Sequence, residues 1–317
     1  MIFFRKFGTF NLILAASLVL LDVYFAAGMA GLGGGRMREN SSGTREYFLS
    51  AAEGGGELVM FPDDVKILID AGPAGSAAAS ALAAILPSGD RYIDIAISSY
   101  PSARQSGGFT EILDDFRIGT FLWSGRRPAG PGAASWGVLR AKLASKGVPV
   151  AVVGAHDRIK TVSGEIAVLS PESAFLKSPE PREASLVLRV EGKGAAEGQS
   201  AAAMTSIFMG GADLAVERYL AAAESAALRA DILKTADAGG SLATGASLLR
   251  DVRPEAVIVA AGGGTGAGKA AAGAPARSLL GRIASSTPAR VFRTDTGGMI
   301  EIWRRRGGAL EAARARK

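Results

Sequence analysis

The side chains that could do chemistry are few, because the 317-residue chain has one histidine, His156, and no cysteine. Without cysteine, disulfides, thiolate nucleophiles and cysteine-ligated zinc sites are excluded. A serine nucleophile activated by an imidazole would have to use His156, and no G-x-S-x-G sequence presents such a serine. A Ser–Lys pair stays open, although no motif points to one. His156 lies in GAHDRI at the expected edge of a strand, where we expect a surface or structural histidine.

A glycine-rich segment is the second candidate. Residues 263–269, GGTGAGK, fit the G-x-x-x-x-G-K pattern of a phosphate-binding loop and follow an expected strand at 257–261. However, residue 270 is alanine, so the hydroxyl that would hold Mg²⁺ is missing, and Pro275 interrupts the expected helix. The chain that remains is too short for a nucleotide-binding sheet. We therefore do not expect nucleotide binding here.

The framework for any site is an alternation of short strands and helices. The chain is 48% hydrophobic and 21% charged, enough for a sizeable core. Two halves, each of mixed strands and helices, predict the α/β class. The expected architecture is an α+β sandwich, in which two sheets pack together and helices cover their outer faces. We expect residues 289–304 to close the domain as a hairpin. Period and turn residues predict strands at 46–52, 57–61, 65–72, 92–99, 119–123, 148–155, 165–171, 184–192, 206–211, 230–236 and 255–263, and helices at 76–86, 107–116, 135–147, 212–223, 245–254 and 275–286.

The first 45 residues differ from the rest. Residues 1–30 contain an apolar stretch at 7–30 after Arg5 and Lys6, which predicts an uncleaved membrane anchor with the body of the protein on the extracytoplasmic side. Cleavage near Ala26-Ala27-Gly28, which would give a secreted protein, is the alternative. Residues 31–45 are expected to be a flexible linker. The domain then runs from 46 to 304, and 305–317 form a basic tail. The net charge of +6 is concentrated at the two ends of the chain.

Several phrases of the domain, taken in order, carry a resemblance. FLSAAEGGGELV, ILIDAGP, IDIAISSYPSARQSGGFTEIL, LRADILKTADAGGS, LLRDVRPEAVIVAAG and VFRTDTGGMIEI are similar in sequence and spacing to segments of the ComEC-type metallo-β-lactamase-fold domain of competence proteins. The resemblance covers about residues 47–302. It implies a metallo-β-lactamase-like αββα fold and a relative of proteins that take up DNA.

The same resemblance implies a site for two divalent ions, typically zinc or manganese, which this chain does not keep. The family's ligand loop H-x-[HD]-x-D-H falls on a segment with no good metal ligand, and an arginine cation there repels a divalent ion. The family's HHGS falls on DAGGS, which begins at Asp237. We therefore expect no cofactor. The degenerate former metal-site positions are Tyr100, Ser102, Arg104, Gln105, Asp237 and Ala238.

Three carboxylates remain as a possible acidic cleft. Asp70 ends the strand of ILIDAGP, where the resemblance implies a residue that holds the ligand loop by hydrogen bonds. Asp213 matches the family's bridging aspartate only after a shift of one residue. Asp213 and Asp237 would face the old cleft, and carboxylates without imidazole bind Mg²⁺ or Ca²⁺ weakly.

The leading hypothesis is a membrane-anchored protein of this fold that has lost catalysis and acts as a binding or scaffold element. The resemblance suggests DNA or another phosphate-rich polymer as its partner, with Arg104 available to meet a phosphate. A residual metal-dependent hydrolase or nuclease using Asp70, Asp213 and Asp237 is the alternative. A chain without selected function also stays open, although the intact hydrophobic pattern indicates that folding is maintained.

Overall fold

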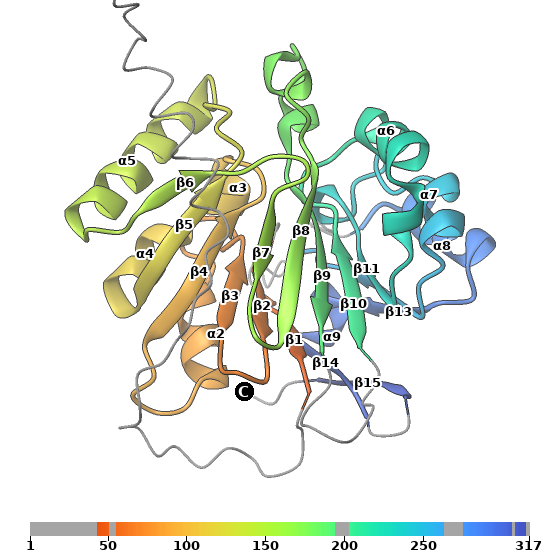
Figure 1. Cartoon of the computed structure of the whole chain (residues 1–317), viewed down its shortest axis with the longest axis horizontal. Coiled ribbons are helices and arrows are strands. Elements are labelled where there is room, and N and C mark those ends of the chain that lie inside the picture. Colours follow the sequence, from red (N-terminus) through yellow and green to blue (C-terminus); the bar gives the residue numbers. More distant parts are fainter. Residues whose placement is uncertain (1–42, 51–54, 194–202, 263–274, 306–307, 315–317) are drawn as a thin grey trace, which may run out of the picture.

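The computed structural model describes residues 43–50, 55–193, 203–262, 275–305 and 308–314. They form four layers: helices, a sheet, a second sheet, and helices again (Figure 1). The αββα sandwich that the sequence predicts is confirmed. Among the described residues, no helix is both long and apolar enough to span a membrane. The apolar stretch at 7–30 lies outside the described residues, as does the glycine-rich segment 263–269, so the anchor stays a prediction.

The first sheet has eight strands among the described residues, in the order β15-β14-β1-β2-β3-β4-β5-β6. Strands β3 to β6 run parallel, and the remaining neighbours are antiparallel. Its strands are β1 (Arg45–Phe48), β2 (Glu57–Met60), β3 (Lys66–Ile69), β4 (Tyr92–Ser98), β5 (Arg117–Trp123), β6 (Val150–Val152), β14 (Ile300–Arg304) and β15 (Leu310–Arg314).

The second sheet has seven strands, again counting described residues, in the order β13-β12-β11-β10-β9-β8-β7. Strands β10 to β13 are parallel, whereas β7 to β10 are antiparallel. Its strands are β7 (Arg158–Lys160), β8 (Gly164–Ser170), β9 (Val187–Gly192), β10 (Met204–Phe208), β11 (Ile232–Lys234), β12 (Ala256–Val259) and β13 (Arg290–Arg293).

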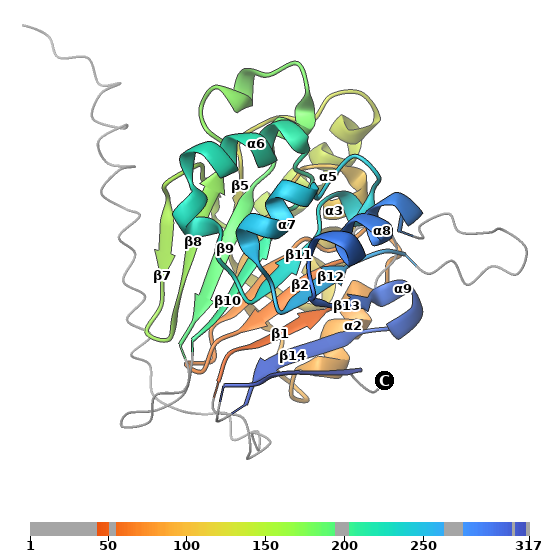
Figure 2. The ribbon, with the colours of Figure 1, turned by 90° about the vertical axis from the view of Figure 1, so that its right-hand side faces the viewer.

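The helices cover the outer faces of both sheets, and Figure 2 shows α6, α7 and α8 lying across the second sheet. The α-helices are α2 (Ala78–Ile85), α3 (Ala103–Ser106), α4 (Phe109–Asp115), α5 (Pro131–Ser145), α6 (Leu214–Ala223), α7 (Ala246–Val252), α8 (Arg277–Ser286) and α9 (Thr294–Gly297). The 3-10 turns are η1 (Phe175–Lys177), η2 (Pro181–Ala184), η3 (Ser225–Leu228) and η4 (Asp237–Gly239).

Three hydrophobic clusters hold the layers together. The middle cluster fills the space between the sheets, where Phe48 of β1 stacks on Phe208 of β10 with ring centroids 6.1 Å apart. A second cluster packs α2, α4 and α5 on the first sheet, and a third packs α6, α7 and α8 on the second. This burial on both faces explains why the strands contain nearly continuous apolar runs.

The C-terminal part differs from the expected hairpin. Strand β13 pairs in parallel with β12 in the second sheet, whereas β14 pairs with β1 in the first. The short helix α9 carries the chain from one sheet to the other, so the TDTGG sequence is a crossover and not a hairpin turn. The first sheet also continues beyond residue 304, because β15 adds to β14 within the segment that the sequence set apart as a basic tail.

Candidate functional site

The positions that the resemblance assigns to a metal site, called here the former ligand positions, lie where parallel strands of the two sheets end beside each other. The loop after β4 meets the loop after β10: the space beside Gly210 is filled by the Ser99 side chain, and that beside Gly211 by Ser185 and Tyr100. The backbone N–H of Leu186 donates to the Ser99 carbonyl, which brings the loop before β9 to the same place. Carboxyl ends of parallel strands are the usual location of ligand sites in such sheets.

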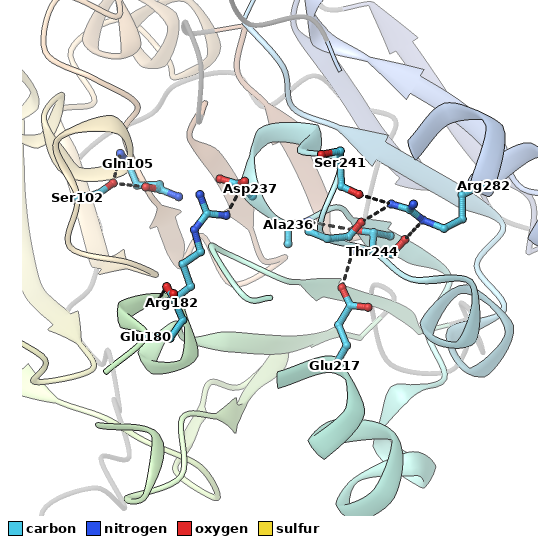
Figure 3. Close-up of polar contacts among 11 residues, drawn as sticks. Ser102, Gln105, Glu180, Arg182, Glu217, Ala236, Asp237, Ser241, Thr244 and Arg282 are labelled. Carbon is cyan, nitrogen blue, oxygen red and sulfur yellow. Dashed lines mark hydrogen bonds and ion pairs between the residues drawn. The ribbon is translucent and has the colours of Figure 1, made fainter. Parts of the chain in front are cut away.

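The first of these positions form a closed hydrogen-bonded turn. Ser102 begins α3, and its Oγ accepts the backbone N–H of Gln105 at 3.3 Å. The Ser102 hydroxyl in turn donates to Oε1 of Gln105, whose side chain is buried (Figure 3). Arg104 is exposed on the same helix. The Ser102 hydroxyl is thus bonded within the turn, to Oε1 of the Gln105 amide and to the Gln105 backbone N–H.

Asp237 forms an ion pair with an arginine to which no motif in the sequence points. Arg182, in η2, places Nη1 2.5 Å from Oδ2 of Asp237, and Figure 3 shows its side chain rising between the Ser102–Gln105 turn and Asp237. The side chains of Arg182 and Asp237 are 40% and 19% exposed. A guanidinium cation therefore contacts the one acidic side chain among the former ligand positions.

The loop that carries Asp237 has a backbone adapted to this contact. Asp237 and Ala238 both have φ near 49°, in the left-handed region that non-glycine residues seldom adopt, and Gly239 follows at 84°. At Gly240 a Cβ would lie 2.5 Å from the Asp237 carboxylate, so the carboxylate folds back over a glycine that leaves it room. Any larger residue at 240 would displace the carboxylate.

A second arginine holds the loop on which Arg182 lies. Arg126, from the loop after β5, donates through Nη1 to the carbonyls of Leu176 and Ser178 at 2.8 and 2.7 Å. Tyr100 lies close to both arginines: burial raises the pKa of its phenol, while the charges of Arg182 and Arg126 lower it. The phenol therefore stays protonated at neutral pH and can donate a hydrogen bond.

The other acidic positions have separate partners. Asp70 is buried with φ 57°, and its carboxylate accepts the Ser99 backbone N–H at 2.8 Å and the Ser99 hydroxyl at 2.5 Å. Burial raises the pKa of Asp70 to about 6, although nearby Lys234 lowers it. Asp213 begins α6 and accepts the N–H groups of Ala215 and Val216 at 2.9 and 3.2 Å, as a helix N-cap does.

A buried cluster of charges lies between the sheets beneath Asp70. Nζ of Lys234, on β11, is 3.0 Å from Oε1 of Glu57 on β2, and these side chains are 4% and 1% exposed. Burial lowers the pKa of Lys234, but the charges of Glu57 and Asp70 outweigh it and the net shift is upward. Lys234 thus stays a cation and links the two sheets. The signal was visible in the sequence, since both residues interrupt apolar strands.

Two charged side chains from the helices of the second sheet fix the loop after Asp237. Glu217 of α6 accepts the backbone N–H groups of Thr244 and Gly245, at 2.5 and 2.7 Å. Arg282 of α8 donates to the carbonyls of the same loop, at Ser241, Ala243 and Thr244 (Figure 3). The loop is held by ionic groups on both sides, and sequence reasoning gave no sign of either.

His156 lies at the surface with its ring 69% exposed, and Nε2 is 3.0 Å from Glu172 Oε1. Within the described part of the chain, no three His, Cys, Asp or Glu side chains are grouped so that they could hold a metal ion. The donors present at the former ligand positions are a phenol, a hydroxyl, an amide and one carboxylate bound to a cation. They do not fit a two-metal site.

The comparisons with known proteins give structural likeness alone. No family model matches the chain, and no curated protein matches it. Solved structures similar to it include a diiron β-hydroxylase from Streptomyces venezuelae, 12% identical over 69% of this chain with TM-score 0.41. Also similar are MEM-A1, a subclass B3 metallo-β-lactamase from a soil metagenome library, 16% identical over 61% with TM-score 0.40, and a diphosphatase of the PhnP family, 10% identical over 68% with TM-score 0.40.

The chain spans 45% of the hydroxylase, 80% of the β-lactamase and 85% of the diphosphatase. Identities this low say nothing of chemistry or substrate, so function has to be argued from the residues of the site.

Proposed function

We propose that this protein is a metallo-β-lactamase-like protein without metal-dependent catalysis, which acts as a binding or scaffold element. The observation that carries the proposal is the ion pair between Arg182 and Asp237. Hydrolysis in this kind of site depends on a metal-bound water, and the metals depend on several imidazole and carboxylate ligands. Here the one acidic former ligand position has an organic cation as its partner.

The guanidinium supports this reading for a physical reason. Arginine stays charged at any ordinary pH, so it repels a divalent ion wherever it lies near the carboxylate. A planar guanidinium can donate two parallel hydrogen bonds to a carboxylate or a phosphate, and it is only weakly hydrated. The site therefore keeps a permanent guanidinium cation beside its carboxylate and lacks the ligands of a metal that would activate water.

We further propose an extracytoplasmic, ComEC-like role at the membrane, with DNA or another phosphate-rich polymer as partner. The support is the ordered set of family-like segments, the basic residues before the apolar stretch 7–30, and the accessible side chains of Arg104 and Arg182. Protease added to spheroplasts should digest the body of the protein, and full protection would contradict this orientation.

The alternative, a residual metal-dependent hydrolase, would use Asp70, Asp213 and Asp237. Each of these carboxylates would first have to leave its present partners: Ser99, the N-terminus of α6 and Arg182, respectively. No specific contact in the described structure favours that rearrangement.

Metal content and cleavage decide between the two proposals. Purified protein should carry less than about one-tenth equivalent of zinc, manganese or iron and should not cut DNA with added Mn²⁺, because such hydrolysis requires metal-bound water. Near-stoichiometric metal after dialysis that is lost in Asp213→Ala or Asp237→Ala, or cleavage that these substitutions abolish, would overturn the non-catalytic proposal in favour of the hydrolase.

A further inference from the structure

Arg182 is a charged group beside the former ligand positions that a solute can reach. Its side chain is 40% exposed, and the only polar partner that the described structure gives its guanidinium is Oδ2 of Asp237. A guanidinium has five N–H donors, so this contact uses a small part of its capacity. Another cation nearby, Arg126, donates through Nη1 to two backbone carbonyls.

The partner carboxylate can separate from Arg182 without becoming a buried, unpaired charge. Asp237 is 19% exposed, so its charge can be hydrated once the contact breaks. Its backbone and that of Ala238 have φ near 49°, a conformation that costs free energy for both residues. The Asp237 backbone N–H donates to the Gly210 carbonyl at 2.9 Å, a contact that does not involve the carboxylate.

Groups beside the pair would also contact an anion bound to Arg182. The Tyr100 phenol lies near the pair, since the charge of Arg182 lowers its pKa and that of Asp237 raises it, while burial is the largest cause of its raised pKa. Glu180 lies nearby as well, and its carboxylate accepts the Arg182 backbone N–H at 3.3 Å. The site thus offers one exposed guanidinium and one phenol to an anion, against the negative charges of Asp237 and Glu180.

From this geometry we propose that Arg182 is a receptor for a phosphate group and that Asp237 occupies it internally until a phosphate displaces it. The proposal rests on the proposed function and identifies the residue that meets the phosphate. That residue is Arg182, to which no sequence motif points; the expectation that Arg104 meets a phosphate stays a separate prediction. Phosphate suits the guanidinium because it carries more charge than a carboxylate and offers several acceptor oxygens for a bidentate contact.

The test measures binding of two probes, inorganic phosphate and a single-stranded oligothymidine, to the full chain by calorimetry at low salt. Asp237→Asn keeps the shape of the side chain but removes its charge, so it should tighten phosphate binding by about tenfold or more. Arg182→Gln should abolish binding, and the double variant should behave as Arg182→Gln. With the oligonucleotide, Arg182→Gln should lower the slope of log affinity against log salt by about one.

Arg158→Gln, which removes an exposed arginine paired with Glu165 on the second sheet, is the matched control and should change nothing. Thermal unfolding of each variant shows that it is folded. Equal binding by wild type and Asp237→Asn, or full binding by Arg182→Gln, would refute the inference, as would no binding by any folded variant. Binding of phosphate itself indicates a small ligand, whereas binding of the oligonucleotide alone indicates a polymer backbone.

The two proposals fail in different ways. If the protein holds no metal and does not cut DNA, but its phosphate binding is unchanged by substitution of Arg182, only the receptor inference is refuted. A protein that holds stoichiometric metal through Asp237 refutes the proposed function and the inference together.

Discussion

Two pairs of opposite charges in this protein use the same chemistry in different surroundings. Lys234 and Glu57 meet between the sheets with side chains 4% and 1% exposed, while Arg182 and Asp237 meet at the loop edge with side chains 40% and 19% exposed. Burial makes the first pair difficult to break, because an unpaired charge would stay in the core. Water can replace either partner of the second, so that contact is exchangeable.

The largest effect should come from removing the buried cation. Lys234→Met leaves Asp70 and Glu57 between the sheets without a positive partner, so we expect a loss of about 3–5 kcal/mol in the free energy of unfolding, measured by urea denaturation at neutral pH. Arg158→Met, at an exposed pair, is the control and should cost less than about 1 kcal/mol. Equal losses in the two variants would contradict the distinction between buried and exposed pairs.

The buried side of the comparison also predicts a pH dependence. Burial raises the pKa of Glu46 from 4.5 to about 8, although a hydrogen bond from Ser206 lowers it. The folded state therefore binds the proton more tightly than the unfolded state, and the free energy of unfolding should fall as pH rises from about 4.5 to about 8.

Glu46→Gln tests this dependence because it keeps the side-chain shape and removes the titration. Urea denaturation at several pH values should show a shallower decline for the variant, by up to about 1.4 kcal/mol per pH unit. The exposed substitution Glu165→Gln should leave the decline as it is in the wild type. A steeper decline in Glu46→Gln would show that the sign is wrong.

An intermediate loss of stability is expected where a buried carboxylate accepts hydrogen bonds from a loop. Glu217→Ala removes the acceptor of the N–H groups of Thr244 and Gly245, which should cost about 1–3 kcal/mol in unfolding free energy. Amide hydrogen exchange should accelerate across residues 237–245. Arg218→Ala, on the exposed side of the same helix, serves as control, and protection unchanged in both variants would show that Glu217 does not hold the loop.

The smallest effect on stability should come from the exposed pair. Arg182→Gln and Asp237→Asn should each change the free energy of unfolding by less than about 1 kcal/mol, since half-exposed ion pairs contribute little. Chemical denaturation checks this directly. A loss as large as that of Lys234→Met would mean that the Arg182–Asp237 contact is structural and cannot be exchanged for a ligand.

Most strands and helices could be predicted from the sequence, because their hydrophobic residues recur with the period of a strand or of a helix. Residues 92–99 were expected as a strand and form β4 at Tyr92–Ser98, and residues 275–286 were expected as a helix and form α8 at Arg277–Ser286. The expected hairpin at 289–304 failed because local turn signals do not say which sheet each flanking strand joins. That choice depends on pairing with β12 and β1, far away in the chain.

The site was accessible only in part. Asp237 was identified through a resemblance, but its partner Arg182 lies 55 positions earlier, in a loop without periodicity or motif. No local sequence pattern predicts such a long-range contact. Glu57 and Lys234 are different, because a charge inside an otherwise apolar strand requires an opposite charge, and pairing the two from sequence was feasible in principle.

Strand β15 has a consequence for how this protein can be handled. Leu310–Arg314 pairs with β14 along its whole length, and Arg290 donates to the Leu310 carbonyl at 2.6 Å. Trimming the chain after residue 304, as its basic composition invites, would uncover the backbone donors and acceptors of β14. Bare sheet edges recruit other chains, so the shortened protein should self-associate, and light scattering at rising concentration would reveal it.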